Sequence, residues 1–488
     1  MASTMKLKPP MPTSNSSRTL GVDLDGTLLA TDALWESMLI LLKKKPMMAL
    51  CLPMWLLKGK AYFKQQIARQ VELNPALLPY RNEVLSFLKL EKQSGRDLVL
   101  ASASDERIVR RVADHLGLFS TVLASDGITN LSGANKLRAL ERYAGGNGFD
   151  YIGNSRHDLP LWKAANQAIL VDPSPWLLKK ARRICSAEQV IAPKVNGLSA
   201  LFRALRIHQW VKNFLVFIPL IMAHRITDMA LVLKGSLAFV AFSLCASSVY
   251  IINDLLDLET DRQHPTKRER PFASGSLQIQ TGMVLAPLLL AGALLTSSLL
   301  LSPLFTALLS SYFLMTMAYS LYFRQKLLLD VLFLAGFYTV RILAGAIAVS
   351  VIVSPWLLTF SVFLFLSLAF LKRYAELRVM EENKQIHHSG RGYVLPDVVM
   401  VQNMGSTSGY LSVLVLALYI NSREVVELYQ HPWLLWLIGP CLLYWIMRMW
   451  FLAHRGQMTD DPILFAVRDR KSYMIGFAVL VLIFAATM

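Results

Sequence analysis

Charged residues are scarce in this chain of 488 residues, and acidic residues are scarcer than basic ones. Charged side chains make up 17% of the sequence and hydrophobic side chains 54%, with a mean hydropathy of +0.42. This composition excludes an ordinary soluble enzyme and indicates a membrane protein with a soluble part. The net charge of +17 is typical of proteins that meet nucleic acid, anionic lipid or phosphorylated substrates.

Cysteine is also rare. The four cysteines are far apart and form no C-x-x-C pair, so neither a disulfide framework nor a cysteine metal site is expected; they are Cys51, Cys185, Cys245 and Cys441. The N-terminus lacks the charged and then apolar pattern of a signal peptide, so none is expected. Residues 1–17 are rich in Ser, Pro and Met, and we expect them to be disordered.

The apolar pattern divides the remaining chain into two domains joined by a linker over 174–207. Within 18–173, the apolar runs at 19–24, 98–101, 122–124 and 151–152 predict strands of a parallel sheet covered by helices. Residues 33–85 interrupt this pattern as a helical insertion. The insertion mixes large apolar residues with lysines, which suits a cap over a site, a helix on a membrane surface, or both.

Residues 208–488 predict an all-α membrane domain of nine spans, at 210–224, 234–253, 281–300, 304–322, 328–348, 355–371, 406–421, 432–449 and 472–488. If the N-terminal domain is cytoplasmic, most basic loop residues lie on the cytoplasmic side, as the positive-inside rule requires. The basic excess is then explained without nucleic acid. This topology also places the acidic segment after the second span on the cytoplasmic side.

A first candidate site follows the strand at 19–24. Asp23 and Asp25 stand at the carboxyl end of a predicted parallel strand, which is where open α/β sheets bind ligands. With Thr27, they form the sequence Asp-x-Asp-Gly-Thr. Ser102 ends the second strand, Lys136 follows, and a Gly-Asn-Ser sequence with Asp158 comes next.

These four elements resemble the motifs of the haloacid dehalogenase superfamily, over about 20–175. The resemblance implies that Asp23 attacks phosphorus and that Asp25 serves as general acid and base. Thr27, Ser102 and Lys136 would hold the phosphoryl oxygens. Mg²⁺ would be held by Asp23, Asp25, Asn154 and Asp158.

Asn154 departs from the superfamily pattern, which has Asp at this position. The substitution removes one negative charge from the metal site while keeping an oxygen donor. Two interpretations stay open. One is an active phosphatase that binds Mg²⁺ more weakly, and the other is a non-catalytic domain kept as a scaffold or regulatory module.

A second candidate site lies where the second span ends. Asn253, Asp257 and Asp261 are spaced by four residues and share a predicted helix face, with Asp254 beside Asp257. Carboxylates at the end of a membrane helix are costly unless they meet cations, and Mg²⁺ bound to a diphosphate is the economical partner. A basic run that suits a further phosphate follows, with Lys267, Arg268 and Arg270.

The N-D-x-x-D-x-x-x-D sequence resembles the first signature of the UbiA prenyltransferase superfamily, and nine spans agree with it. The superfamily's aromatic prenyltransferases carry a second acidic motif, D-x-x-Y-A-x-x-D. Here Tyr374 and Ala375 remain, but Leu371 and Arg378 replace the two aspartates, and Lys372 and Arg373 lie between them. This exchange predicts a phosphate held directly by cations rather than through metal.

Other polar residues extend this site. Lys212 precedes the first span, and Tyr319, Lys326 and Asp330 flank the fourth loop. Arg341 lies within the fifth span, where an arginine either serves function or pairs with a neighbour such as Asp330.

The ensemble resembles the decaprenyl-phosphate phosphoribosyltransferases of the superfamily. The resemblance implies a bacterial inner-membrane enzyme that takes phosphoribosyl pyrophosphate as donor and a polyprenyl phosphate as acceptor. A homo-oligomer stays open as its assembly. Asp254, Asp257 and Asp261 would hold Mg²⁺ and pyrophosphate, with Asn253 beside them. The basic run would grip the 5-phosphate, and other phosphates would be held by Lys212, Lys326, Arg341, Lys372 and Arg373, with Tyr319 and Asp330 nearby. The N-terminal domain would then remove the product's 5-phosphate.

Two rival readings remain. An aromatic prenyltransferase with a non-catalytic N-terminal domain would need the missing second acidic motif. A transporter would fit nine spans but not an acidic motif at a helix end.

Overall fold

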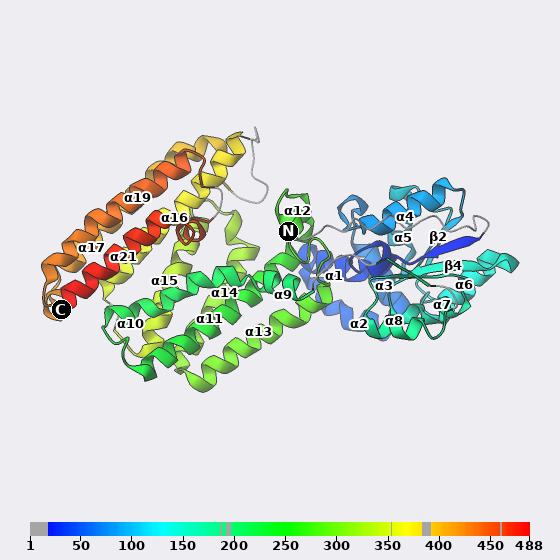
Figure 1. Cartoon of the computed structure of the whole chain (residues 1–488), viewed down its shortest axis with the longest axis horizontal. Helices are drawn as coiled ribbons and strands as arrows, with labels where there is room; N and C mark the ends of the chain where they lie inside the picture. The colour runs from blue at the N-terminus through cyan, green and yellow to red at the C-terminus, as the bar shows by residue number, and fades with distance from the viewer. Residues whose placement is uncertain (1–17, 186–187, 192–196, 353, 383–391, 459–460) are drawn as a thin grey trace, which may run out of the picture. The chain divides into compact units, whose positions relative to one another are not determined.

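The computed structural model describes residues 18–185, 188–191, 197–352, 354–382, 392–458 and 461–488. The predicted disorder of 1–17 concerns residues outside this set. The chain forms two compact units (Figure 1). Unit 1 comprises Met1–Leu205 and Tyr250–Leu285, and unit 2 comprises Arg206–Val249 and Ala286–Met488. The acidic segment therefore belongs to the same compact unit as the N-terminal domain.

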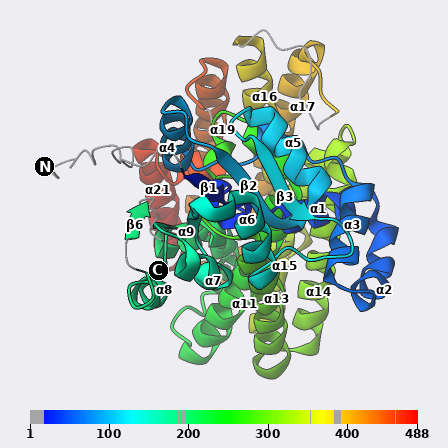
Figure 2. The ribbon, with the colours of Figure 1, turned by 90° about the vertical axis from the view of Figure 1, so that its right-hand side faces the viewer.

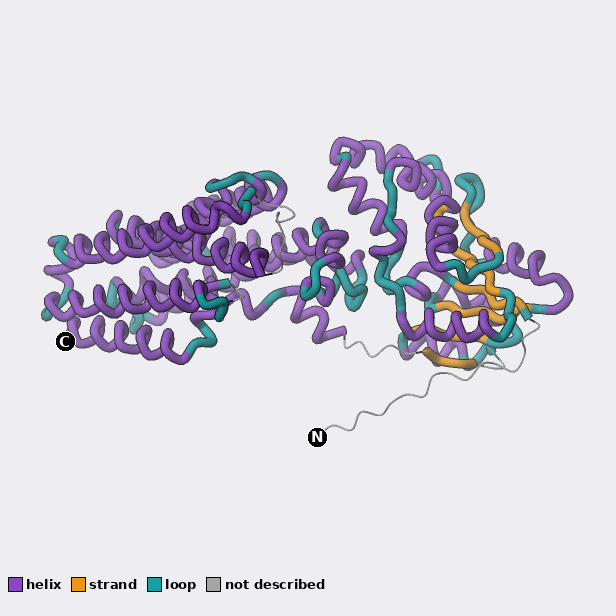
Figure 3. The backbone as a smooth tube through the Cα atoms, turned by 90° about the horizontal axis from the view of Figure 1, so that it is seen from above, coloured by secondary structure: helices purple, strands orange, loops and turns teal. Residues whose placement is uncertain are grey.

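Unit 1 contains a six-stranded parallel sheet in the order β3-β2-β1-β4-β5-β6. Its strands, orange in Figure 3, are β1 (Thr19–Val22), β2 (Leu98–Asp105), β3 (Thr121–Ser125), β4 (Phe149–Gly153), β5 (Ala168–Val171) and β6 (Glu188–Ile191). The predicted parallel sheet is confirmed. Because β1 lies between β2 and β4, the ends of these three strands meet at one edge, which is where the first candidate site was expected.

Helices cover both faces of the sheet (Figure 2). One face packs against α1 (Ala33–Lys44), α3 (Lys60–Gln70), α4 (Asn82–Gln93) and α5 (Glu106–Leu116). The other face packs against α6 (Ala134–Ala144), α7 (Leu159–Ala164) and α8 (Pro175–Ala181). The short α2 (Leu52–Leu57) completes the helical insertion that the sequence predicts between β1 and β2. Asp32 caps the N-terminus of helix α1, because its side chain accepts hydrogen bonds from the backbone N–H groups of Leu34 and Trp35.

The structure differs from the prediction over 174–207, which the sequence suggested as a linker. This segment carries α8, β6 and α9 (Gly197–Leu205), and β6 pairs with β5 along the whole of that strand. The difference arises because β6 is a four-residue edge strand with one buried residue, Ile191. So short a strand leaves almost no apolar pattern in the sequence.

Unit 2 and the segments next to it contain eight helices long and apolar enough to cross a membrane, counted over the residues that the structure describes. The helices are α11 (Met229–Leu256), α13 (Ile279–Leu300), α14 (Pro303–Leu321), α15 (Leu329–Val349), α16 (Pro355–Glu382), α17 (Val398–Ile420), α19 (Ile438–His454) and α21 (Arg470–Thr487). With the short 3₁₀ turns that precede α17 and α19, the sixth and seventh of these apolar segments extend over 395–420 and 432–454. The chain is thus a multi-pass membrane protein.

The first predicted span, at 210–224, is not one continuous helix, which leaves eight of the nine predicted spans as long helices among the described residues. It consists of a 3₁₀ segment, Ile207–Phe217, followed by the five-residue α10 (Ile218–Met222). Three of its polar side chains bond to other elements: Trp210 to Ser247, Asn213 to Ser243, and Lys212 to Asp461. These tertiary hydrogen bonds explain why regular α-helical winding does not persist here.

Close helix packing in unit 2 depends on small residues. A Cβ at Gly405 would lie 2.4 Å from the Trp450 ring, and one at Gly409 would lie 2.7 Å from Ile446. The two glycines are four residues apart on α17, so they let α19 approach along one face. The Trp450 indole N–H also donates to Ser367 Oγ on α16 at 3.2 Å.

A buried ion cluster supports the sheet of unit 1. Arg96, which is 1% exposed, bonds to Glu91 Oε2 at 2.9 Å and to the Asp150 carboxylate. It also donates to the backbone carbonyl of Arg18 at 3.0 Å, just ahead of β1. Since Asp150 lies on β4, this arginine joins the entry to β1 with its neighbouring strand.

Replacing this arginine is expected to destabilise unit 1. Arg96→Met would leave two carboxylates buried without their cation, at a cost of about 3–5 kcal/mol. Hydrogen exchange of β1 and β4 amides in the full chain would measure the loss of protection. Arg110→Met is the matched control, because Arg110 pairs with Glu106 on an exposed face. Equal protection in both variants would contradict a supporting role for Arg96.

Candidate functional sites

The first site is built on the turn that follows β1. Residues 24–28 form a tight helical turn in which Gly26 has φ +77°. A Cβ at Gly26 would lie 2.2 Å from Asn154 Nδ2, so both the backbone angle and the close approach require glycine. The turn brings Asp23 and Asp25 to the carboxyl edge of the sheet, as the sequence predicts.

Asp23 lies against the predicted lysine. Its Oδ1 is 2.6 Å from Lys136 Nζ, and its Oδ2 accepts a hydrogen bond from the Thr27 hydroxyl at 3.1 Å. Burial raises the pKa of Asp23 to about 7, although Lys136 opposes the rise. Burial by itself would lower the pKa of Lys136, but Asp23 and Asp158 raise it above its usual value. The pair is therefore a charged lysine beside a carboxyl that ionises near neutrality.

Asp25 is positioned by two serines of β2. Ser104 Oγ donates to Asp25 Oδ2 at 2.6 Å and Ser102 Oγ at 3.2 Å, while Asp25 Oδ1 accepts from the backbone N–H of Ala33 at 2.7 Å. Ser102 was predicted to hold phosphate, and here it contacts Asp25. Ser104 was not predicted. The signal for it was present, because alternate residues of a strand face the same side.

Asp158 stabilises the loop of the site that carries Asn154. Its Oδ2 accepts hydrogen bonds from the backbone N–H groups of Asn154 and Ser155 and from Ser155 Oγ, at 2.9 to 3.1 Å. Its Oδ1 accepts from the Tyr151 hydroxyl at 3.0 Å. These bonds hold the loop that carries Asn154. Asp158 is thus placed to orient the site, and its ligand role stays a prediction.

The oxygen atoms present can accommodate Mg²⁺. The Thr27 hydroxyl lies 3.1 Å from Asp23 Oδ2 and 3.3 Å from Asn154 Oδ1, so these two oxygens face a common point. Carboxylate and amide oxygens are donors that Mg²⁺ accepts. Among the described residues, no group of three or more His, Cys, Asp and Glu side chains has metal-binding geometry.

Two basic residues outside the predicted motifs also reach this site. Lys64, on α3 of the cap, donates to the Ala103 carbonyl at 2.7 Å and to Asn130 Oδ1 at 3.0 Å. Burial lowers the pKa of Lys64, while Asp25 and Asp32 raise it. Arg81 donates to the Gly26 carbonyl at 3.1 Å. Lone basic residues in a helical segment carry no motif, so only the fold could reveal them.

A cavity of about 430 Å³ within unit 1 opens onto this site. Asp25, Arg81 and Asn154 line it together with residues 275–278 and 280–281. The second group follows the acidic segment in the sequence. The cavity therefore connects the phosphoryl site to the part of the chain just beyond the second candidate site.

The second site has a different arrangement from the one its spacing predicts. Helix α11 ends at Leu256, and Asp257 stands at the start of α12 (Leu258–Gln263) with φ −100° and ψ 12°. Asp254 Oδ1 and Asp261 Oδ2 both contact Arg270 Nη1, at 3.1 and 2.6 Å. Asp257 instead lies 3.5 Å from Lys43 Nζ of α1. The break at Asp257 explains why Asp254, rather than Asp257, shares a face with Asp261.

The convergence of Asp254 and Asp261 on one cation suits a metal site. Both are nearly buried, at 2% and 3% exposed. Burial raises the pKa of Asp261, and Arg270 opposes the rise. Arg270 was predicted to grip a phosphate, and here its guanidinium stands between carboxylates where a divalent cation could bind. Oxygen donors of this kind fit Mg²⁺.

The neighbours of this segment differ in accessibility. Lys267 is half-buried and Arg268 is exposed, so both remain candidates for a phosphate. Asn253 is half-buried, and its carbonyl accepts the Asp257 N–H at 2.9 Å. Arg262 pairs with Glu36 of α1 through two hydrogen bonds, and both side chains are almost fully buried. This pair anchors the acidic segment to the cap within unit 1.

Several predicted phosphate ligands of unit 2 are engaged with one another. Arg373 pairs with Asp330 through two hydrogen bonds, and the Tyr319 hydroxyl donates to Asp330 at 2.7 Å. Arg341 bonds to Asn213 Oδ1 at 2.8 Å and to the Tyr312 hydroxyl at 3.0 Å. The suggested Arg341–Asp330 pair is therefore wrong, because Arg373 occupies that carboxylate.

The remaining predicted lysines fall into two kinds. Lys326 is exposed, with Nζ 4.9 Å from the centre of the Tyr322 ring. Lys212 and Lys372 both reach Asp461 Oδ2, at 2.8 and 3.1 Å. Burial alone would raise the pKa of Asp461, but these lysines hold it well below its usual value. Asp461 was not predicted from the sequence. An aspartate directly before a proline is a common start of a helix, and here Asp461 caps α20 (Pro462–Ala466).

The ionisation of Asp23 predicts pH-dependent metal binding. With a pKa near 7, this carboxyl is mostly protonated at pH 6 and mostly charged at pH 8, so Mg²⁺ should bind roughly tenfold more weakly at pH 6. Calorimetry on the full chain would measure this. Subtracting the binding by Asp23→Asn isolates this site from the acidic segment. An Asp23-dependent affinity that does not change between these pH values would contradict the prediction.

Comparison with known protein families matches both parts of the chain. Residues 214–482 match the model of the UbiA prenyltransferase family, and residues 20–163 match that of the haloacid dehalogenase-like hydrolases. The first match contains Asp254, Asp257 and Asp261. The second match contains Asp23, Asp25 and Asp158. The expected resemblance to both families is thereby confirmed.

Three relatives align with this chain over most of their own length. "Uncharacterized protein y4nM" of Sinorhizobium fredii is 36% identical over 457 residues, which are 93% of this chain and 88% of that protein. "Nodulation protein NoeC" of Azorhizobium caulinodans is 36% identical over 269 residues, covering 55% and 87%. "Decaprenyl-phosphate phosphoribosyltransferase" of Mycobacterium tuberculosis is 31% identical over 302 residues, covering 60% and 96%. With the family match over 214–482, these similarities show that the chain belongs to the UbiA prenyltransferase family and carries a haloacid dehalogenase-like domain ahead of its membrane domain.

Proposed function

We propose that the membrane domain transfers phosphoribose from phosphoribosyl pyrophosphate to a polyprenyl phosphate. The observation that carries this proposal is that the chain keeps the first acidic motif of its family but has basic residues at the position of the second acidic motif. Asp254 and Asp261 converge on a cation, whereas Leu371 and Arg378 replace the second pair of acids. The relative from Mycobacterium tuberculosis, named for this activity, supports the same assignment.

The acidic segment would bind the pyrophosphate end of the donor. Asp254, Asp257 and Asp261 would hold Mg²⁺, which when bound neutralises the pyrophosphate. Arg270, which contacts Asp254 and Asp261 in this structure, would be free to contact a donor phosphate when a metal holds those carboxylates. An oxygen of the acceptor phosphate forms a bond to the anomeric carbon of ribose, and the bond from that carbon to pyrophosphate breaks. Nearby cations, including Lys267 and Arg268, stabilise the departing charge.

The N-terminal domain would hydrolyse a phosphate monoester. In its charged form Asp23 attacks phosphorus, while Asp25, oriented by Ser102 and Ser104, protonates the leaving oxygen. Asp25 then takes a proton from the water that cleaves the aspartyl-phosphate. Lys136 neutralises phosphoryl oxygens beside Asp23. Mg²⁺, when bound, supplies further neutralisation of the same oxygens.

The two activities would act in sequence on one lipid. The transferase product carries a 5-phosphate on its ribose, and the hydrolase domain would remove it. The cavity between Asn154 and residues 275–281 in unit 1 supports this order, because it opens the hydrolase site towards the segment that follows the acidic motif. A shared chain raises the effective concentration of the product at the second site. Both sites would face the cytoplasm at a bacterial inner membrane.

Label transfer would test the first step. With Mg²⁺, radiolabelled phosphoribosyl pyrophosphate and undecaprenyl phosphate, we expect label in the lipid phase. Asp261→Asn should lower the rate by about 100- to 1,000-fold, because it removes one of the two carboxylates that converge where the metal would hold the leaving group. Glu269→Gln is the matched control, since Glu269 is an exposed acid of the same segment and has no assigned role.

The opposite result would reassign the chain within its family. Absence of labelled lipid, together with turnover of a polyprenyl diphosphate and an aromatic acid, would contradict phosphoribosyl transfer. It would leave the family and the fold unchanged.

Product analysis would test the second step. Asp23→Asn should still form labelled lipid at the normal rate, but the product should keep its 5-phosphate, because the nucleophile is gone. Asp114→Asn, an exposed acid on α5, is the control and should give the dephosphorylated product. Mass spectrometry of the extracted lipid distinguishes the two. If the unaltered protein also leaves the 5-phosphate in place and hydrolyses no phosphate ester, the domain is a non-catalytic module.

A further inference from the structure

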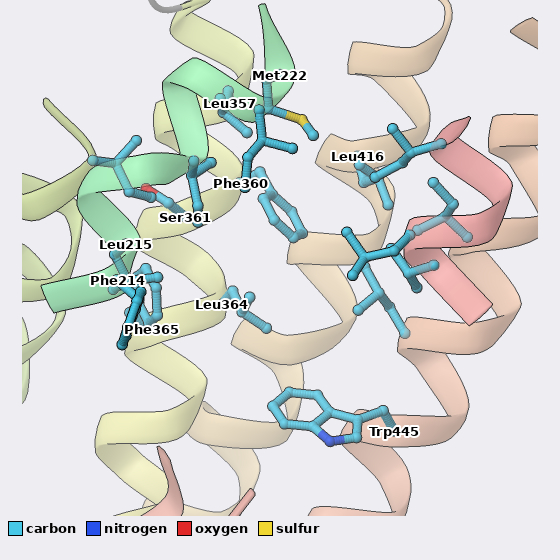
Figure 4. Close-up of a pocket in the computed structure, with 18 of the residues that line it drawn as sticks. Phe214, Leu215, Met222, Leu357, Phe360, Ser361, Leu364, Phe365, Leu416 and Trp445 are labelled. Atoms are coloured by element: carbon cyan, nitrogen blue, oxygen red, sulfur yellow. The ribbon is translucent and has the colours of Figure 1, made fainter. Parts of the chain in front are cut away.

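Apolar side chains have different surroundings in the two units. In unit 2 they enclose a cavity of about 570 Å³, and Figure 4 shows Phe214, Phe360 and Trp445 around it. Its walls belong to the membrane domain, where apolar side chains are expected. Unit 1 is a sheet domain, yet residues 46–57 of its helical insertion expose large apolar side chains. An exposed apolar cluster marks a surface that meets another molecule or a membrane.

Segment 46–57 has two sides. It consists of a 3₁₀ turn, Pro46–Cys51, followed directly by α2. Four of its side chains pack against the core of unit 1: Met48, Cys51, Leu52 and Trp55. Five others are 52% to 88% exposed: Met47, Leu50, Met54, Leu56 and Leu57. Four of these five follow one another at intervals of three or four residues, so they share one side of the segment. The packed side fixes the segment, so the exposed side is a defined surface.

Helix α1, which precedes this segment, is attached to the end of a membrane-spanning helix. Helix α11 has 28 residues and is therefore about 42 Å long, which is the thickness of a bilayer with its headgroups. Its last residue, Leu256, is thus expected at a headgroup layer. Lys43 Nζ of α1 donates to the Leu256 carbonyl at 2.7 Å, and Glu36 of α1 pairs with Arg262. All these residues belong to unit 1. Segment 46–57 therefore begins close to a membrane surface.

The charges around the segment suit an anionic surface. Residues 37–71 contain seven Lys and Arg residues and no Asp or Glu. Five of the lysines are exposed and stand at the two ends of the segment: Lys43, Lys44, Lys45, Lys58 and Lys60. Basic clusters of this kind are attracted to anionic lipid. Because the apolar segment is shorter than 18 residues, it suits the plane of the membrane surface and not a span.

The phosphoryl site does not account for this exposed surface. The described residues that line the 430 Å³ cavity beside Asp25 include none of residues 46–57. The insertion reaches the phosphoryl site through Lys64 of α3, which bonds to the Ala103 carbonyl and to Asn130. The two parts of the insertion are therefore distinct. Helix α3 serves as a cap, and segment 46–57 faces outwards.

We propose that segment 46–57 is an anchor that binds the surface of an anionic bilayer. Its exposed apolar side chains enter the boundary between headgroups and acyl chains, and the lysines at its two ends contact lipid phosphates. Trp55, on the packed side, joins the anchor to the core of unit 1. The anchor holds the hydrolase-like domain at the membrane surface. This proposal does not depend on the reaction assigned to either site.

Photochemical labelling of the full chain would test the anchor. The chain would carry p-benzoylphenylalanine in place of Leu50 or Leu57, in nanodiscs of phosphatidylglycerol and phosphatidylcholine. After irradiation, mass spectrometry should find lipid joined to positions 50 and 57 at least about tenfold more often than to position 143. Tyr143 is the matched control, because it is 40% exposed and lies on α6, which covers the other face of the sheet from α1.

Charge variants would test the lysines. Phosphatidylglycerol should be enriched among the lipids joined to position 50, relative to its share of the bilayer. Lys44→Gln combined with Lys58→Gln should reduce this enrichment by about twofold or more, because both ends of the segment lose charge. Lys89→Gln combined with Lys92→Gln removes two exposed lysines of α4 and should leave the enrichment unchanged.

The remaining outcomes would overturn the proposal. Crosslinks from positions 50 and 57 to a second copy of the chain, in place of lipid, would make this surface a contact between copies. Lipid labelling at only one of the two positions, or no more than at position 143, would exclude insertion of the apolar side. An enrichment that the Lys44 and Lys58 substitutions do not change would exclude the lysines from headgroup binding.

Discussion

The need to neutralise carboxylates in places that water reaches poorly governs both units of this protein. Removing a carboxylate from water costs several kcal/mol unless a cation or several donors meet it. Arg96 meets two acids beneath the sheet of unit 1, and Arg373 meets Asp330 among the helices of unit 2. These pairs lie away from solvent, so loss of either partner leaves an uncompensated charge. They hold the frameworks that position the sites.

The same constraint shapes the candidate sites, but there the neutralising cation is replaceable. Arg270 stands between Asp254 and Asp261, and Lys136 contacts Asp23. A site of this kind can exist before its ligand binds, because protein side chains supply the missing charge. A bound metal would then take the place of Arg270 between Asp254 and Asp261. This exchange limits the cost of keeping charged groups ready for a charged substrate.

The structure also distinguishes basic residues that are enclosed in permanent ion pairs or hydrogen bonds from basic residues that a ligand could reach. The sequence does not make this distinction. Arg341, Arg373 and Lys372 are all basic residues in membrane helices. In the structure Arg341 bonds to Asn213 and Tyr312, and Arg373 is enclosed by Asp330. Lys372 instead shares a carboxylate with Lys212 at the edge of an apolar cavity. Sequence spacing gives no measure of enclosure, so it treats the three alike.

The sequence by itself determined the fold class and the motifs, because period-two and long apolar patterns and short acidic motifs are local features. It identified the sheet edge with Asp23 and Asp25, the acidic segment and the loss of the second acidic motif. Tertiary structure decided which groups meet. The break at Asp257 turns Asp254 towards Asp261, β6 extends the sheet into the expected linker, and Ser104, Lys64 and Asp461 join sites from distant elements. Such partnerships depend on how separate elements pack, which no local pattern records.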